Sequence, residues 1–424
     1  MKTRNIILAA LLLLACASCR KEAGYVANPY MNELSSYMDF SYEHQFESVW
    51  QGVNSGYAFW DIDTVDWDCR YKTCSARLAF LMKDGNDSIS DEDLQAFYEG
   101  LVGNLIDHHM YVEVKNISTG NAISVSPGDI EVRKRSYYHE ALNVVSIAEV
   151  LEALETQNVG TTSDRLIGMS DASTYVISCV INLPDGRIIP YLWQSGYNIS
   201  ETLKYLADDS YDPNNDEEAN IHAAAVAIDN FFKTICNTPR EQIAGIILDN
   251  RSNGGGNMSD FNYIVGSFVS SPAAILENRS KNGIGRRDFA PWAQALAYPN
   301  GKYHRDIVAE NIPYVILQDI NSLSMGELTG LSARHVLSAH IIGERSYGGQ
   351  GTLSTEMTPI YNTGTFGDRS AATGHYVYMA TYANRTPGGE VLEGKGSSPD
   401  EEVLFNDKGA FGQLKAAIDY IKNK

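Results

Sequence analysis

The amino-acid sequence predicts an α/β fold, in which helices cover a largely parallel sheet. From residue 219 onward, segments with helical spacing alternate with short apolar runs that are typical of buried strands. Two of these runs, 245–248 and 314–317, lead into turns rich in small residues. In open α/β sheets the crevice beyond the carboxyl ends of the strands holds the functional site, so these two turns are the first candidates.

The second turn places Ser324 where a strand gives way to a helix, whose apolar residues recur near helical spacing from Met325 to Leu337. The first N–H groups of a helix have no intrahelical partner, and the macrodipole adds partial positive charge there. A nucleophile at this point would find its oxyanion facing free amides, chiefly that of Met325. Serine is also a favoured helix N-cap for hydrogen-bonding reasons alone, and this stretch by itself leaves both interpretations open.

The first turn, DNRSNGGGN at 249–257, carries three consecutive glycines directly after a buried strand. Glycine allows positive φ and close backbone approach, so amides can converge on one point. The turn lacks the GKS/T of a phosphate loop, which argues against nucleotide binding. It is therefore a second candidate for binding an anion, with a plain flexible turn as the alternative.

Composition limits the possible partners. The 424 residues are 44% hydrophobic, which is typical of a globular protein, and 53 acidic residues against 33 basic ones give a formal charge of -20. This charge repels nucleic acid and anionic membrane surfaces. After the predicted signal segment neither CxxC nor HExxH spacing occurs, so the sequence predicts no metal and no cofactor. Cys69 and Cys74 are expected to fill a core rather than to form a bridge.

Residues 1–19 are predicted to be a signal peptide, because basic Lys2 and Arg4 precede an apolar core too short to span a bilayer. The segment ends in LLLLACASC, which resembles a bacterial lipoprotein box. We expect Cys19, in preference to Cys16, to carry a lipid that anchors the protein to a bacterial membrane in the cell envelope, periplasmic or surface-facing. Ordinary signal cleavage without a lipid is the alternative. Residues 20–40 are interpreted as a tether.

Three helices are predicted over 41–109, which we interpret as an N-terminal helical subdomain. Aromatic and apolar residues at helical spacing predict the first helix over 46–57, and the second begins near Asp66. Ser90 opens a capping-box signature for the third helix, which is expected to end at Asp107. The aromatic residues of this region are expected to lie in a core rather than to form a ligand platform.

A pair of histidines, His108 and His109, lies between the third helix and the strand-like MYVEV. Imidazole can accept and return a proton near neutral pH, which makes the pair a candidate for acid–base chemistry. A junction histidine is often only structural. Because adjacent residues of an extended segment point in opposite directions, we expect only one of the two to face a site.

Residues 110–205 are predicted to be an intermediate α+β segment. It includes a helix near 144–154 and a hairpin over 174–193 with its turn at 184–186. No convincing glycine-rich carboxylate-binding loop of a PDZ module is found, and SPGDIEV is only a weak partial match. The acidic run 208–218 is interpreted as a solvated linker, and 206–424 as the α/β core.

Six segments in order resemble the C-terminal-processing and tricorn-like family of serine peptidases. They are FESVWQGVNSGYAFWDIDTVDW, LIDHH, ILDNRSNGGGN, SKNGIGRRDF, SLSMGE with GERSYGG, and EGKGSSPD. They span nearly the whole chain after the signal, and 110–205 matches worst. The resemblance implies a crotonase-like α/β core flanked by helices, and hydrolysis of peptide bonds through an acyl-enzyme.

By this resemblance, Ser324 of SLSMGE is the nucleophile and His109 of LIDHH is the general base. His108 stands where tricorn-like members carry a serine that helps to orient the site. A histidine base predicts that kcat/KM rises with pH through a single ionisation near neutrality.

The same resemblance assigns the oxyanion amides to Met325 and to the glycine turn, with Gly256 preferred over Gly255. It also assigns a supporting acidic residue late in the chain, for which Glu393 of EGKGSSPD is the best match.

One departure from the family decides between two possible bases. Processing peptidases with a Ser/Lys dyad carry a lysine on the segment after the nucleophile helix, where this chain has Gly349. A histidine is then the remaining way to activate Ser324, as in tricorn-like members without a PDZ module. Lys395 is the alternative base, although a lysine between two glycines is poorly placed for the burial that would lower its pKa. The expected partner is a peptide or protein substrate; the alternatives are a catalytically inactive peptide-binding relative and a glycan-binding surface lipoprotein.

Overall fold

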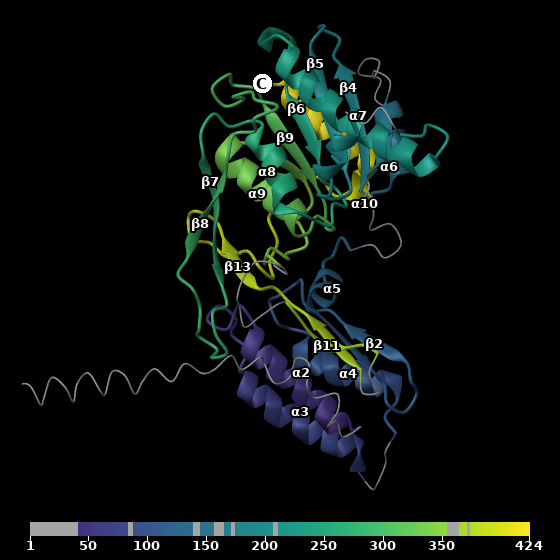
Figure 1. Ribbon diagram of the computed structural model, residues 1–424, viewed down its shortest axis with the longest axis vertical. Coiled ribbons are helices and arrows are strands. Elements are labelled where there is room, and N and C mark those ends of the chain that lie inside the picture. Colours follow the sequence, from purple (N-terminus) through teal and green to yellow (C-terminus); the bar gives the residue numbers. More distant parts are fainter. Residues whose placement is uncertain are drawn as a thin grey trace, which may run out of the picture.

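The computed structural model describes residues 41–83, 88–138, 145–156, 165–170, 174–206, 211–353, 364–370 and 374–424. The predicted signal peptide with Cys16 and Cys19, and the tether at 20–40, lie outside these residues. Figure 1 shows two lobes stacked along the long axis of the molecule, with long strands running between them on one side. The described helices include none that is both long enough and apolar enough to cross a membrane.

The upper lobe is built on a seven-stranded sheet, which confirms the predicted α/β core. Its strands lie in the order β14-β10-β9-β6-β5-β4-β3, and all neighbours from β5 to β14 are parallel. The strands are β3 (Leu166–Met169), β4 (Tyr175–Asn182), β5 (Ile188–Gln194), β6 (Ile246–Asp249), β9 (Tyr314–Gln318), β10 (His340–Gly343) and β14 (Glu401–Glu402). The predicted hairpin is β4 and β5. The central strands β6 and β9 are buried throughout, because helices cover both faces of the sheet.

Helices α7, α8 and α9 pack on one face of this sheet, and α6 and α10 pack on the other. Their bounds are α6 (Ile147–Thr156), α7 (Asp216–Asn237), α8 (Met258–Gly266), α9 (Met325–Leu337) and α10 (Phe405–Lys422). Short 3-10 helices η3 (Glu201–Leu206) and η4 (Arg240–Gln242) precede and follow α7. The carboxyl ends of β6 and β9 lie side by side, so the two turns singled out in the sequence meet there.

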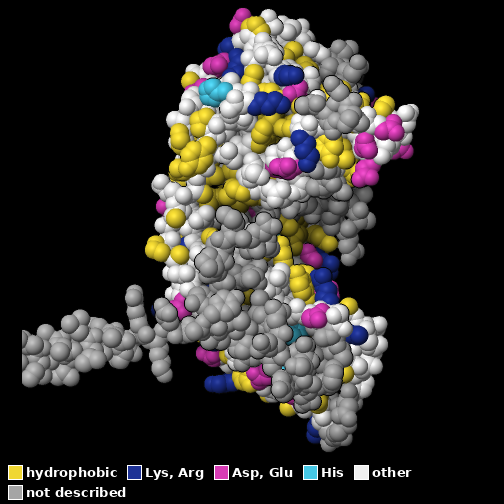
Figure 2. Space-filling model, viewed as in Figure 1, with side chains coloured by type: hydrophobic (Ala, Val, Ile, Leu, Met, Phe, Trp, Pro, Cys, Tyr) yellow, Lys and Arg dark blue, Asp and Glu magenta, His cyan; other side chains and the backbone are white. Residues whose placement is uncertain are grey.

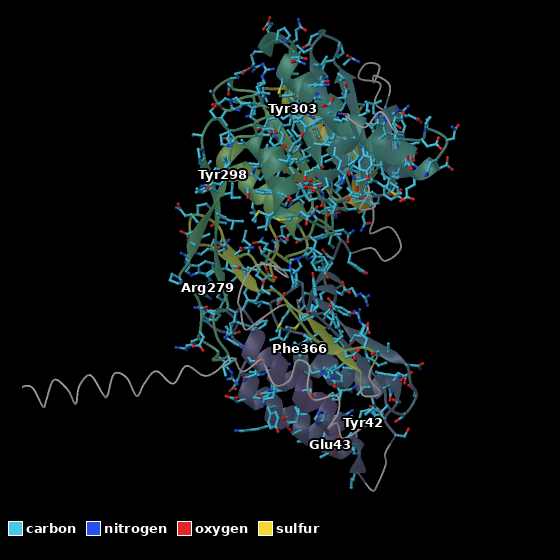
Figure 3. The ribbon with its side chains drawn as sticks, viewed as in Figure 1. Tyr42, Glu43, Arg279, Tyr298, Tyr303 and Phe366 are labelled. Carbon is cyan, nitrogen blue, oxygen red and sulfur yellow. The ribbon has the colours of Figure 1, made fainter. Side chains whose placement is uncertain are left out.

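The lower lobe combines the three predicted helices with a four-stranded antiparallel sheet of order β11-β12-β1-β2. Its elements are α2 (Tyr42–Gly56), α3 (Trp67–Leu81), α4 (Asp91–Val102), β1 (Tyr111–Lys115), β2 (Ala122–Val125), α5 (Pro127–Val132), β11 (Thr365–Asp368) and β12 (His375–Tyr378). The ring of Phe366 fills the space beside Gly52 of α2, where an added Cβ would lie 2.1 Å from the ring (Figure 3). Strands β11 and β12 therefore belong to the same lobe as the N-terminal helices, although they lie near the end of the chain.

Several predicted boundaries are wrong. Residues 110–205 are not one unit, because β1, β2 and α5 belong to the lower lobe whereas β3 to β5 extend the upper sheet. Strands β11 and β12, which the sequence analysis placed in the core at 206–424, belong to the lower lobe instead. The third helix ends at Val102, five residues before Asp107, and Cys69 is exposed although Cys74 is buried.

A three-stranded sheet of order β13-β7-β8 connects the lobes. It consists of β7 (Ala273–Ser280), β8 (Ala293–Ala297) and β13 (Tyr382–Arg385). Arg279, seen between the lobes in Figure 3, pairs with Asp61, and Arg286 pairs with Asp68 at 2.5 Å. These contacts run from the SKNGIGRRDF segment to the N-terminal helices. On the face shown in Figure 2, basic and acidic side chains of the described residues are interspersed.

Candidate active site

A cleft of about 550 Å³ lies where the two lobes meet. Both lobes contribute to its walls, which contain Ser324, Met325, Gly256, His108 and His109 together. The full lining is His108, His109, Met110, Tyr111, Ser126, Gly254, Gly256, Asn257, Met258, Leu323, Ser324, Met325, Leu328, Tyr347, Thr352, Leu353 and Tyr378. Five of the predicted site residues, which are spread over more than two hundred positions of the chain, thus line one cavity.

Ser324 occupies a strained backbone position at the start of α9. Its φ of 58° and ψ of -124° lie outside the regions that residues with a side chain normally adopt, and its hydroxyl makes no capping hydrogen bond. Its N–H donates instead to the carbonyl of Gly349 at 2.9 Å. The ordinary N-cap interpretation is therefore wrong, and the hydroxyl is left free beside the cleft. The nearby Ser322 is buried and donates to the carbonyl of Asn250 at 2.7 Å, so it serves the turn.

The glycine turn comes into direct contact with Ser324. A Cβ on Gly255, where φ is +97°, would lie 2.5 Å from the Cβ of Ser324 and 3.0 Å from the backbone nitrogen of Met325. Only glycine fits at this point. The N–H of Gly255 donates to Asn253 Oδ1 at 2.9 Å, so Gly255 is not available as the oxyanion donor that the sequence had kept open. Within the described part of the chain, the N–H groups of Gly256 and Met325 have no acceptor.

A buried ion pair fixes the strand end that carries this turn. The guanidinium of Arg251 donates to both carboxylate oxygens of Asp249, at 2.8 and 2.5 Å, and both side chains are fully buried. Arg251 also donates to the carbonyl of Ala410 and to Gln413 of α10, at 2.9 and 3.0 Å. Because every charge has partners, the pair can anchor the turn to the C-terminal helix without leaving a buried charge unsatisfied.

His109 reaches the cleft from the junction between α4 and β1. The residue is half-buried, but both ring nitrogens are shielded and have no hydrogen-bond partner among the described residues. Burial, helped by the neighbouring His108, lowers the pKa of His109 to about 4. The imidazole is therefore neutral at pH 7 and free to accept a proton. Its ionisation lies below the near-neutral value expected from the sequence.

Gly349 explains how His109 fits beside Ser324. A Cβ added at Gly349 would lie 3.2 Å from Nδ1 of His109 and 2.4 Å from Cδ1 of Leu323. The absence of a side chain at this position therefore makes room for the imidazole. At the position where the resemblance places a lysine in dyad peptidases, this chain has a glycine bordered by Leu323 and the ring of His109.

Two buried carboxyl groups, Asp107 and Glu393, stand beside His109. One ligand-type atom from each of the three residues lies within 4.8 Å of the other two. Asp107 accepts from the N–H groups of His109, Met110 and Ala380 at 3.0, 3.1 and 2.8 Å. Burial raises the pKa of Asp107 to about 7, and burial together with the charge of Asp107 raises the pKa of Glu393 well above its usual range.

Glu393 is held equally firmly from the other side. It accepts from the N–H of His108 at 3.0 Å and from those of Gln350 and Gly351 at 2.7 Å each. The two carboxyls and one imidazole are a ligand set that a metal ion could use. However, every carboxylate oxygen of the pair already accepts at least one backbone N–H, which favours a hydrogen-bonded carboxyl pair over metal ligation.

His108 and Lys395 make poorer bases than His109. His108 is buried, its Nδ1 lies 3.1 Å from the carbonyl oxygen of Tyr347, and burial lowers its pKa to about 4. Its backbone N–H links the histidine pair to Glu393. Lys395 is exposed and does not line the cleft, so it lacks the desolvation that a lysine base needs.

Sequence reasoning missed Asp107, although the residue is part of the LIDHH segment. The signal was its place two residues before His109, which lets one carboxylate accept the N–H groups of His109 and Met110. The weak SPGDIEV match forms helix α5, capped by Ser126, rather than a carboxylate-binding loop. Gly128 of this helix packs against Tyr347, where an added Cβ would lie 2.6 Å from the ring.

Comparisons with known proteins agree with this geometry. Residues 219–403 match the family model described as "Peptidase family S41". The carboxy-terminal processing protease CtpB of Bacillus subtilis (strain 168) is 22% identical over 187 residues, which are 44% of this chain. The matched part covers only 33% of that relative's length.

A crystal structure of a candidate peptidase from Parabacteroides merdae ATCC 43184 superposes with a TM-score of 0.59 at 18% identity. It covers 89% of this chain and 95% of the other, so the likeness extends over both lobes and concerns the fold. The matched family segment contains the glycine turn, Ser324 and Glu393, whereas His109 and Asp107 come from the lobe that precedes it. Within residues 219–403, the chain therefore resembles peptidase family S41.

Proposed function

We propose that this protein is a serine-type peptidase that hydrolyses peptide bonds through an acyl-enzyme on Ser324, with His109 as the general base. The observation that carries the proposal is the strained Ser324, which shares a cleft with the neutral ring of His109, while neither the Ser324 hydroxyl nor that ring has a hydrogen-bond partner among the described residues. A strained backbone conformation is typical of residues whose function requires that conformation. The family match supports the same reaction class.

In the proposed first step, the Oγ of Ser324 attacks the carbonyl carbon of the scissile peptide bond while His109 takes the hydroxyl proton. The carbonyl oxygen becomes an oxyanion, which the N–H groups of Gly256 and Met325 stabilise. The tetrahedral intermediate collapses when the C–N bond breaks, and the leaving amine takes the proton from the imidazolium. Water then repeats the sequence on the ester and restores Ser324.

Asp107 and Glu393 support this cycle by stabilising the imidazolium that forms on His109. A carboxylate beside a protonated imidazole lowers the energy of the charged intermediate. The six backbone N–H groups that hold the pair keep it in place without side-chain movement. We assign Glu393 and Asp107 to this role, and His108 to holding Glu393 through its backbone.

The glycan-binding alternative predicted exposed, clustered aromatic residues in the helical region. Trp67 is only 1% exposed, and Trp50 and Trp60 pack against the core of the lower lobe. These aromatic side chains therefore pack in the core of the lower lobe instead of forming an exposed platform for a glycan, which favours the peptidase. We place the protein in the cell envelope, anchored through a lipid on Cys19, on the basis of the signal and lipoprotein-box pattern alone.

Peptide hydrolysis by three proteins tests the assignment of the base. His109→Ala should lower kcat/KM by about 10²–10⁴-fold, because general-base catalysis is lost. Lys395→Ala, which changes an exposed side chain outside the cleft, should retain the activity of the unmodified chain. The reverse pattern, with Lys395→Ala inactive and His109→Ala active, would replace His109 by a serine–lysine dyad.

A further inference from the structure

The described residues that form the walls of the cleft carry no formal charge. Among its described lining residues there is no lysine, arginine, aspartate or glutamate, although 20% of the whole chain is charged. The two histidines of the lining are neutral at pH 7, because burial lowers the pKa of each to about 4. The catalytic carboxyls Asp107 and Glu393 lie behind His109 and do not line the cleft.

The remaining lining is mostly apolar or aromatic. Met258 and Leu323 come from the upper lobe, Tyr111 and Tyr378 come from the lower lobe, and Leu353 follows the glycine-rich GGQG segment. Besides Ser324, the histidines and the tyrosine hydroxyls, the polar side chains are those of Ser126, Asn257 and Thr352, which can hydrogen-bond a peptide backbone but cannot neutralise an ion.

Two arginines that contact residues of this lining already have ion-pair or hydrogen-bond partners. Arg369 lies over the ring of Tyr111 and pairs with Glu113 at 2.9 Å. Arg135 donates to the carbonyls of Arg345, Ser346 and Tyr347 on the outer side of Tyr347. Neither cation is free to receive a carboxylate from a bound chain.

We infer that the cleft takes an internal, uncharged stretch of a polypeptide, with apolar or aromatic side chains on the residues that flank the scissile bond, and that it does not recognise a free carboxyl terminus. This inference rests on the proposed peptidase function and gives it a substrate class. A charge enclosed in the cleft would lose its hydration without gaining an ion partner. A terminal carboxylate within the cleft meets the same penalty.

The test uses internally quenched peptides whose central residues vary and whose solubilising charges lie at the far ends. Peptides with Leu or Phe on both sides of the scissile bond should exceed those with Asp or Lys there by at least about 10-fold in kcat/KM. Ending the peptide close to the scissile bond with a carboxamide should give hydrolysis at least as fast as ending it with a free carboxylate.

Charge variants of Met258 connect the preference to the cleft itself. Met258→Lys should improve hydrolysis of the Asp peptides relative to the Lys peptides, and Met258→Glu should do the opposite. Phe80→Lys and Phe80→Glu are matched controls, because Phe80 is 65% exposed on α3 and outside the cleft. They should leave the ranking unchanged.

Two different failures are distinguishable. If a serine-reactive fluorophosphonate labels the protein and charged or free-carboxylate peptides are hydrolysed as fast as the apolar amides, the substrate class is wrong and the peptidase function stands. If no peptide is hydrolysed and no adduct forms, the proposed function fails and the substrate class fails with it.

Discussion

The carbonyl of Gly349 accepts the backbone N–H of Ser324 at 2.9 Å, while Leu323 and the ring of His109 border the space that a side chain at Gly349 would need. One residue therefore holds the proposed nucleophile and leaves room for the proposed base. A side chain at this position would have to displace Leu323, whose Cδ1 would lie 2.4 Å from the added Cβ, and would crowd the imidazole, whose Nδ1 would lie 3.2 Å away. The glycine at position 349 thus leaves space for a histidine that comes from the other lobe.

The first prediction concerns Gly349→Ala. The new methyl group must displace Leu323 or the imidazole, so we expect kcat to fall by about 10²-fold through misplacement of the base. Gly388→Ala is the matched control, since a Cβ there meets its nearest neighbour at 3.6 Å. Peptide hydrolysis by the two variants measures the difference, and equal activity would show that Gly349 does not position His109.

A second prediction uses the strain at Ser324. Ser324→Gly should relieve the positive φ and raise the free energy of unfolding by about 1 kcal/mol, while turnover is abolished. Ser338→Gly, at φ 52° in the left-handed cap of α9, should stabilise to a similar extent and keep full activity. Denaturant unfolding and peptide hydrolysis measured on both variants give the comparison. A Ser324→Gly protein that is less stable than the unmodified chain would mean that its backbone is not strained.

The glycine turn gives a third prediction. Gly255→Ala would drive a methyl group into Ser324 and towards the N–H of Met325, so we expect a fall in kcat of about 10²–10³-fold. Gly186→Ala carries a similar positive φ, +86°, but its Cβ would meet nothing within 4 Å. Both variants should lose stability from backbone strain, Gly255→Ala by more because of its contact with Ser324, and only Gly255→Ala should lose activity. If both retain activity, the triple glycine is only a turn.

The pH dependence of the reaction gives a fourth prediction. His109 is neutral across the working range because burial lowers its pKa to about 4, whereas burial raises the pKa of Asp107 to about 7. The anionic carboxylate that stabilises the imidazolium therefore appears as the pH rises through about 7. We expect kcat/KM to rise with pH through one ionisation there, and we assign this ionisation to the Asp107–Glu393 pair rather than to the imidazole.

Asp107→Asn tests that assignment. The variant should show lower activity and a shifted ionisation, because Glu393 remains, and Asp107→Asn combined with Glu393→Gln should give a profile that is flat between about pH 6 and 9, because the coupled carboxyl pair is then gone. Asp185→Asn in the exposed hairpin turn should keep the unmodified profile. A near-neutral ionisation that persists in the double variant would contradict the assignment and return the ionisation to His109.

Much of this architecture could be predicted from local sequence patterns. The strand ending at Gln318, the helix beginning at Met325 and the helix cap at Asp66 follow from spacing and capping rules that act within a few residues. The convergence of the glycine turn and Ser324 followed from the general position of sites in α/β sheets.

Other features depend on contacts between distant segments and left no local pattern. Strand β12 pairs with β1, more than two hundred residues earlier, which is why the segment boundaries at 110 and 205 are wrong. The N–H of Gly255 donates to the side chain of Asn253, and a run of three glycines in the sequence does not reveal which of their N–H groups is used in this way. The elevated pKa of Asp107 arises from burial between the lobes, which only the assembled structure provides.

Labelling with a serine-reactive fluorophosphonate tests whether Ser324 is acylated with the help of His109. The adduct is mapped by mass spectrometry. We predict a single adduct on Ser324, strongly slowed in His109→Ala, absent in Ser324→Ala and unchanged in Lys395→Ala. An adduct on Ser322 or on another serine, or labelling of Ser324 at full rate in His109→Ala, would contradict the account.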